Sequence, residues 1–114
     1  MALVTPGDTV EVALSRMTKG KTGAAVVVDD EGRLVGIFTH GDFVRAFQRD
    51  HAISNKPVSE FMTAGPVTVA NDKLATEVLR IFKGHRIDDL VVVDAEGRPV
   101  GLVDNQDLGK LKLI

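Results

Sequence analysis

An internal repeat is the feature that most constrains this chain. The segment VVVDDEGRLVG at 26–36 returns as VVVDAEGRPVG at 91–101, with nine identities in eleven positions. A shift of 64 residues aligns Asp8 with Asp72, and a shift of 65 aligns the later segments, so the second copy has one extra residue between Lys83 and Leu90. Agreement of this extent does not arise by chance, so the fold must contain two copies of one unit.

Each copy contains the same order of predicted elements. A short extended segment is followed by a helix with apolar residues at helical spacing, then by two apolar strands joined through a turn with Asp and Gly. A second helix begins at Thr39 in one copy and at Asp104 in the other. The predicted strands are 3–5, 24–28 and 34–38 in the first copy and 67–69, 90–93 and 100–103 in the second.

The predicted fold class is therefore α/β (α+β), with two tandem β-α-β-β-α repeats related by pseudo-two-fold symmetry. Repeat 1 covers 1–50, a linker with a short helical turn covers 51–65, and repeat 2 covers 66–114. A unit of this size is marginal as an independent fold, so the two should cover each other's apolar surfaces. Because the chain starts almost directly on a strand, we expect repeat 1 to be truncated at its N-terminus and the chain to come from a longer polypeptide.

Two segments match the pattern of a capping box. Asp8 with Glu11 predicts the start of the first helix, and Thr39 with Asp42 predicts the start of the second. The second pair also has a functional interpretation. A helix N-terminus offers unpaired N–H donors and a partial positive charge that suit a phosphate, and Gly41 would let a ligand approach the backbone. Asp42 only accepts hydrogen bonds and suits a pair of hydroxyls. Capping alone and ligand binding both remain open, and they are compatible.

Arg45, one helical turn after Asp42, and further polar residues could meet a phosphate, although a solvated charged surface is the alternative interpretation. The candidate binding residues are Lys21, Thr22, Thr39, His40, Gly41, Asp42 and Arg45 in repeat 1 and Asp107 in repeat 2.

Repeat 2 carries Asp104 where repeat 1 carries Thr39. Asp is still a good N-cap, but a carboxylate about 4 Å from a phosphate costs about 1 kcal/mol in water and more at lower dielectric. We therefore predict asymmetric occupancy, with repeat 1 the better phosphate site. Asp107 would serve a sugar hydroxyl or the geometry of the helix start.

Composition excludes several classes of function. The formal net charge is −2 and the chain has no Trp or Tyr, which argues against a nucleic-acid partner. It has no Cys, no apolar run long enough for a bilayer and no secretory signal pattern, so we predict a cytoplasmic protein without a membrane partner. Its three His lack metal-ligand spacing, and no Ser–His or Cys–His set indicates catalysis. We predict no metal and no enzymatic activity.

The doubled pattern V-V-D-x-x-G-x-x-V-G followed by G-h-h-[ST]-x-x-D resembles a pair of CBS domains, a regulatory (Bateman) module, over essentially the whole chain. The resemblance implies that adenosine nucleotides such as AMP or ATP bind in a cleft between the repeats. The motif Asp would take the ribose hydroxyls, and the Ser or Thr with nearby N–H groups would take the phosphate.

Two segments resemble the C-terminal CBS pair of arabinose 5-phosphate isomerases, GIFTHGDFVRAF and VSEFMTAGPVTVANDKLATEVLRIF. The chain departs from that family at His40, Phe43, Val44 and Asp104. The resemblance implies a sugar-phosphate isomerase domain upstream, with this chain its non-catalytic regulatory fragment, and it adds CMP-Kdo to the candidate ligands. The alternative is a ligand-free dimerisation scaffold of the same parent. A homodimer is expected in either case.

Overall fold

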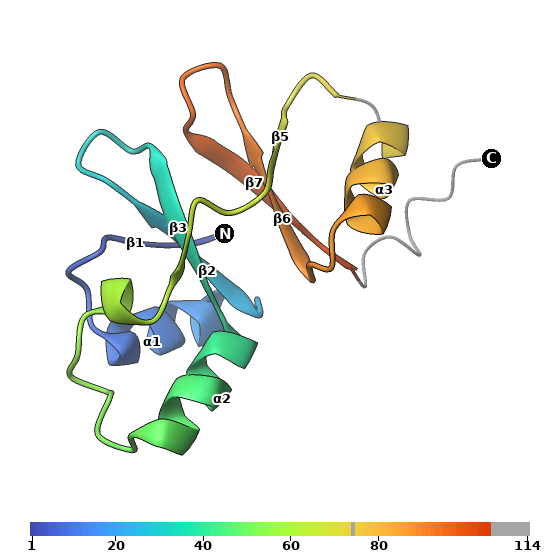
Figure 1. The fold of residues 1–114 in the computed structure, drawn as a ribbon. Helices are drawn as coiled ribbons and strands as arrows, with labels where there is room; N and C mark the ends of the chain where they lie inside the picture. The colour runs from blue at the N-terminus through green and yellow to red at the C-terminus, as the bar shows by residue number, and fades with distance from the viewer. Residues whose placement is uncertain (74, 106–114) are drawn as a thin grey trace. The chain divides into compact units, whose positions relative to one another are not determined.

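The computed structural model describes residues 1–73 and 75–105 of the chain. The chain divides into two compact units, residues 1–66 and 67–114. Each contains a mixed β-sheet, with two α-helices in the first unit and one in the described part of the second, so the predicted α/β class and the two repeats are confirmed (Figure 1).

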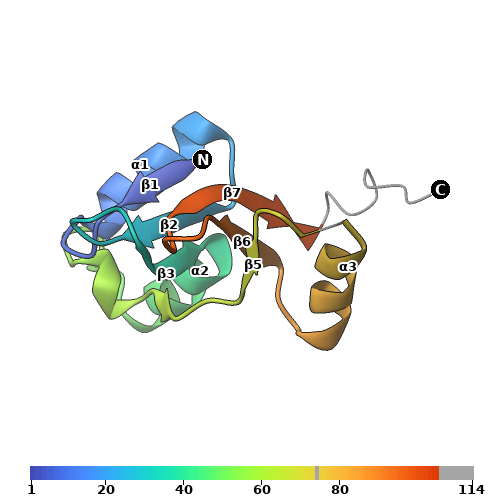
Figure 2. The same cartoon turned by 90° about the horizontal axis from the view of Figure 1, so that it is seen from above.

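The first unit contains a four-stranded sheet in the order β1-β2-β3-β4. Its strands are β1 (Ala2–Val4), β2 (Ala24–Val28), β3 (Leu34–Thr39) and β4 (Thr63–Ala64). β1 runs parallel to β2, and the other neighbours are antiparallel. α1 (Val10–Gly20) lies alongside β1 and α2 (His40–Arg49) alongside β3 (Figure 2).

One apolar core holds this unit together. The helical spacing predicted for α1 is confirmed, since its Val10, Ala13 and Met17 are all buried. They pack with strand residues of one sheet face, and Phe43 and Ala46 of α2 cover the edge of the same cluster. The strand residues of this core are Ala2, Val4, Ala25, Val27 and Phe38.

The segment predicted as a linker contributes to this core. Ile53 and Val58 are fully buried in it, and Val58 opens the short 3₁₀ helix η1 (Val58–Glu60), which matches the predicted helical turn. β4 then pairs with β3 at Gly36, where a Cβ atom would lie only 2.5 Å from the Met62 sulfur. The close approach of this segment to β3 therefore depends on a glycine.

The second unit contains a three-stranded sheet in the order β5-β6-β7. Its elements are β5 (Thr68–Ala70), α3 (Ala75–Gly84), β6 (Asp89–Val93) and β7 (Pro99–Asp104). Val69, Val78, Phe82 and Leu90 form its core. The predicted helix after Asp104 lies outside the described residues, as does Asp107.

The two hairpins repeat the same local geometry. In each, the Asp that opens the turn accepts hydrogen bonds from the N–H groups two and four residues further on, at 2.9–3.0 Å. Gly32 has φ 80° and Gly97 has φ 81°, which is the left-handed region that glycine adopts most readily. A register shift follows Val27 in one hairpin and Val92 in the other. The predicted hairpins are therefore confirmed down to their turn chemistry.

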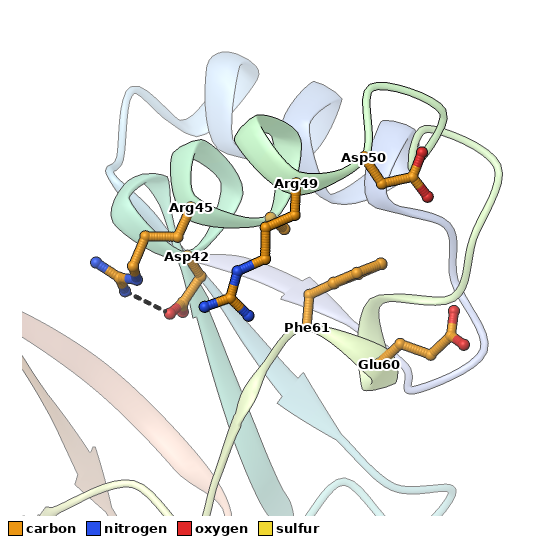
Figure 3. Close-up of a pocket in the computed structure, with 7 residues that line it drawn as sticks. Asp42, Arg45, Arg49, Asp50, Glu60 and Phe61 are labelled. Carbon is orange, nitrogen blue, oxygen red and sulfur yellow. Dashed lines mark hydrogen bonds and ion pairs between the residues drawn. The ribbon is translucent and has the colours of Figure 1, made fainter.

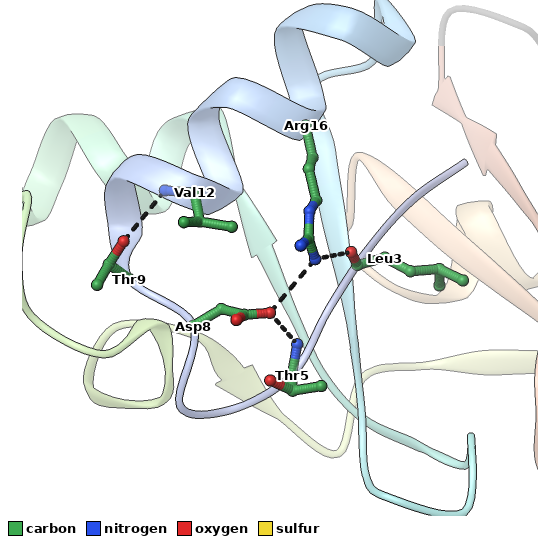
Figure 4. A network of polar contacts seen from close by, with 6 residues as sticks. All are labelled: Leu3, Thr5, Asp8, Thr9, Val12 and Arg16. Carbon is green, nitrogen blue, oxygen red and sulfur yellow. Dashed lines mark hydrogen bonds and ion pairs between the residues drawn. The ribbon is translucent and has the colours of Figure 1, made fainter.

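The predicted capping box at Asp8 and Glu11 is wrong. α1 begins one residue later than that pattern requires, because Thr9 is its N-cap and accepts from the Val12 N–H at 3.2 Å. The Asp8 carboxylate instead accepts from the Thr5 N–H at 2.8 Å and from Arg16 at 3.3 Å (Figure 4). Asp8 thus closes the turn between β1 and α1 and leaves the helix start to its neighbour.

Candidate functional site

The capping box predicted at the start of α2 is present. Thr39 is the N-cap with extended backbone, and its hydroxyl accepts from the Asp42 N–H at 3.1 Å. The Oδ2 atom of Asp42 accepts in return from the Thr39 N–H at 2.9 Å. The stabilising interpretation of this motif is therefore confirmed, and the same two side chains stand at the end of β3 where a ligand would meet the helix.

The first turn of α2 keeps one backbone donor available. The His40 N–H donates to the Gly23 carbonyl at 2.9 Å, and the Asp42 N–H is used by the cap. Among the described residues, the N–H of Gly41 has no hydrogen-bond partner. A donor in the first turn of a helix, where the macrodipole is positive, is suited to an anionic group.

Asp42 also forms an ion pair. Its Oδ1 atom lies 2.9 Å from Nη2 of Arg45, one helical turn further on. The Asp42 side chain is only 11% exposed, whereas that of Arg45 is 68% exposed. Each carboxylate oxygen therefore has a partner, the backbone of the cap for Oδ2 and an exposed cation, which a ligand could replace, for Oδ1.

Two depressions in the first unit divide the predicted site residues between them. One, of about 260 Å³, brings together Lys21, Thr22 and His40 beside the C-terminal end of α1. The other, of about 350 Å³, lies between α2 and η1 and contains Asp42 and Arg45. Thr39 and Gly41 line neither of them. The remaining lining residues are Leu14, Met17, Thr18 and Gly23 in the smaller depression and Ala46, Arg49, Asp50, Glu60 and Phe61 in the larger.

The smaller depression depends on the way α1 ends. Lys21 is its C-cap in the left-handed conformation, with φ 51°, and the Thr22 N–H bonds back to the Met17 carbonyl at 3.0 Å. This reversal turns the chain into β2 and places Thr22 and Gly23 next to His40. Glycine is the usual residue in this conformation, so the sequence, which has Lys here, gave no signal that the helix ends at this position.

The larger depression contains residues that the sequence reasoning missed. Arg49 and Phe61 lie at its middle, with the Asp42–Arg45 pair at one end and Asp50 and Glu60 at the other (Figure 3). The spacing of Arg49 four residues after Arg45 on a helix could have identified it. No local signal could have identified Phe61, because only the folding of the 51–65 segment brings it against α2.

Asp50 is an anion at neutral pH. The ammonium of Lys56 lies 2.6 Å from its Oδ2 atom and, with the Ala52 N–H, holds the pKa of this carboxyl below its usual range. Asp50 and Glu60 therefore place two carboxylates at the end of the larger depression that lies away from the Asp42–Arg45 pair.

Within residues 1–73 and 75–105, no three His, Cys, Asp or Glu side chains gather as metal ligands would. No helix in the same ranges is long and apolar enough to cross a membrane.

The family model described as CBS domain matches residues 1–49 and 58–111. The chain therefore belongs to the CBS-domain family and is a CBS pair. The arabinose 5-phosphate isomerase KdsD of Pseudomonas aeruginosa is 41% identical over 102 residues, which are 90% of this chain and 31% of that protein. The chain thus spans about a third of the length of this curated relative.

Solved structures have the same fold. The cytosolic domain of the Mg²⁺ channel MgtE in complex with ATP is 30% identical, with a TM-score of 0.79 over 97% of this chain and 44% of that one. CBSX2 in complex with AMP is 24% identical, with a TM-score of 0.80 over 97% of this chain and 86% of that one.

Proposed function

We propose that this CBS pair is a regulatory module whose first repeat binds an adenosine nucleotide at the start of α2. The observation that carries the proposal is the first turn of that helix, which presents together the Thr39 hydroxyl, the Asp42 carboxylate and the Gly41 N–H, to which no described residue bonds. The ATP held by the MgtE cytosolic domain and the AMP held by CBSX2 favour this class of ligand.

Each group has a proposed role. The phosphate would accept from the Gly41 N–H and the Thr39 hydroxyl, with Arg45 as its cation. The ribose hydroxyls would donate to Asp42. Lys21, Thr22 and His40 would line the approach from the smaller depression.

The two repeats should differ in occupancy. Thr39 pairs with the first residue of β2 and Asp104 with the first residue of β6, so the two hold equivalent register positions. A carboxylate at this position would repel a phosphate, and we propose that phosphate binding is confined to repeat 1. Asp107 would then contact a sugar hydroxyl or support the helix start in repeat 2.

The likeness to KdsD suggests the context of this module. We propose that the chain is the non-catalytic part of a cytoplasmic arabinose 5-phosphate isomerase, that it pairs with a second copy of itself, and that its ligand controls the catalytic domain. The nucleotide sugar CMP-Kdo is then a second ligand to test, as feedback on the pathway that such an isomerase would supply.

A thermal unfolding screen with AMP, ATP, CMP and CMP-Kdo tests the proposal. A ligand present at about 100 times its Kd should stabilise the fold by about 2.7 kcal/mol, which raises the Tm by several degrees. Asp42→Asn should abolish the shift, because the amide can still accept at the cap but is a poorer acceptor for two hydroxyls. Asp30→Asn, at an exposed position of the first hairpin turn, is the matched control and should leave the shift unchanged.

Two results would change the assignment. No shift with any of the four compounds would contradict ligand sensing and favour the scaffold alternative. A shift with CMP-Kdo alone would replace the adenosine nucleotide with the pathway product as the ligand.

A further inference from the structure

The guanidinium of Arg45 lies where the proposed ligand would bind. Its Nη2 atom is 2.9 Å from Asp42 Oδ1, and a Cβ atom added to Gly41 would lie 3.3 Å from its Nη1 atom. The side chain therefore folds back over the first turn of α2, and Figure 3 shows it directed at the Asp42 carboxylate. In the structure Arg45 covers both the carboxylate and the glycine.

The second oxygen of Asp42 already has a partner in the helix cap. Oδ2 accepts from the Thr39 N–H at 2.9 Å, as part of the cap that begins the helix. A ligand hydroxyl that takes Oδ1 therefore competes with Arg45 for that oxygen. A neutral hydroxyl replaces a hydrogen bond between two charged groups with one in which only the acceptor is charged, so a nucleoside gains little from this exchange.

A phosphate on the same ligand makes the displacement of Arg45 from Asp42 more favourable. The displaced guanidinium is 68% exposed, sits on a flexible stem beside the helix N-terminus and is able to pair with a phosphate there. We propose that Arg45 is a specificity-determining residue that exchanges Asp42 for the ligand phosphate, so that the site selects a ribonucleotide over the corresponding nucleoside. This inference rests on the proposed function and assigns Arg45 the role of a competitor as well as a phosphate contact.

Arg49 provides the contrast. It lies four residues further along α2 and lines the same depression, but no ion pair joins it to any described residue. It therefore does not mask Asp42. Replacing it removes the same charge from the same helix face and leaves the Asp42–Arg45 pair intact.

Calorimetric titration of the chain and of its Arg45→Met and Arg49→Met variants with AMP and adenosine, and with CMP and cytidine, tests the exchange. In Arg45→Met the nucleotide should bind about tenfold more weakly, since a hydrogen bond to a charged group is lost. The nucleoside should bind about threefold more tightly, because no exposed ion pair has to be broken. The preference for nucleotide over nucleoside should therefore fall by about thirtyfold, and in Arg49→Met it should change by less than about twofold.

The opposite signs are the decisive readout, since a merely structural role of Arg45 would weaken both ligands together. Parallel losses for nucleotide and nucleoside in Arg45→Met would overturn the exchange while leaving the proposed function in place. An equal fall in preference in Arg49→Met would also overturn it, since general positive charge would then explain the selectivity. No binding of any of the four compounds would overturn the proposed function, and this inference with it.

Discussion

Exchanging Thr39 for Asp, the residue that repeat 2 carries at the same register position, should separate helix capping from ligand binding. In the structure the Thr39 hydroxyl accepts from the Asp42 N–H at 3.1 Å. Asp ranks with the best N-cap residues, so Thr39→Asp should change the free energy of unfolding by less than about 0.5 kcal/mol. Thr39→Ala leaves that N–H without its partner and should cost about 1 kcal/mol.

Binding should follow the reverse order. A carboxylate about 4 Å from a phosphate is unfavourable by about 1 kcal/mol per unit charge in water and about 4 kcal/mol at an effective dielectric of 20. Thr39→Asp should therefore weaken AMP binding by at least about tenfold, since 1.4 kcal/mol is a factor of ten. Thr39→Ala loses only one hydroxyl contact and should be weakened by about fivefold. The more stable variant is thus expected to be the weaker binder.

Urea unfolding and calorimetric titration with AMP, both at low salt, measure the two effects. Gln48→Glu introduces the same charge at an exposed position of α2 and is the control for net charge. AMP binding by Thr39→Asp at the affinity of the unchanged chain would show that the phosphate does not approach this residue. Equal loss of affinity in Gln48→Glu would show that the effect is not local.

Three further predictions concern the fold. Ile53→Ala should lower the free energy of unfolding by about 2–5 kcal/mol, because the side chain is fully buried. Ser54→Ala, at the exposed neighbouring position, should change it little. Equal urea midpoints for the two variants would show that this segment is only a linker. Gly32→Ala should cost about 1–2 kcal/mol, since φ is 80°, and a neutral result would mean that the turn adopts another conformation. Lys56 lowers the pKa of Asp50, so the ion pair between them stabilises the fold at pH values above the usual pKa of 3.8. This stabilisation is lost as the pH falls through the lowered pKa. Asp50→Asn should accordingly be less stable than the parent chain at neutral pH and equal to it in strong acid, and a difference that persists in strong acid would contradict this cause.

Local patterns predicted the elements well. The two hairpins follow from an Asp and a Gly at matched positions, and the apolar spacing of α1 identified the residues that enter the core. The start of α1 was predicted incorrectly, because Asp8 and Thr9 are both good caps and the pattern cannot choose between them. Thr9 is the N-cap because the Asp8 carboxylate already accepts hydrogen bonds from the Thr5 N–H and from Arg16.

The candidate site was predicted in part. Thr39 and Asp42 were identified because their mutual hydrogen bonds span three residues and are visible as a motif. Lys21 and His40 were also among the predicted residues, and the pairing of β2 with β3 brings them to one depression, where the His40 N–H donates to the Gly23 carbonyl. Phe61 was not predicted, because it reaches α2 only after its segment folds back.

The duplicated unit, its two equivalent hairpins and a capped helix could be predicted from the sequence alone, because these features depend on hydrogen bonds and periodicities within a few residues. Three features depend on the packed chain: Ile53 and Val58 of the 51–65 segment lie in the core of the first unit, the candidate residues fall into two depressions, and Arg45 is paired with Asp42. These outcomes depend on the packing of segments far apart in the chain and on which rotamer the space around each side chain allows, and neither is encoded in the spacing of residues along the sequence.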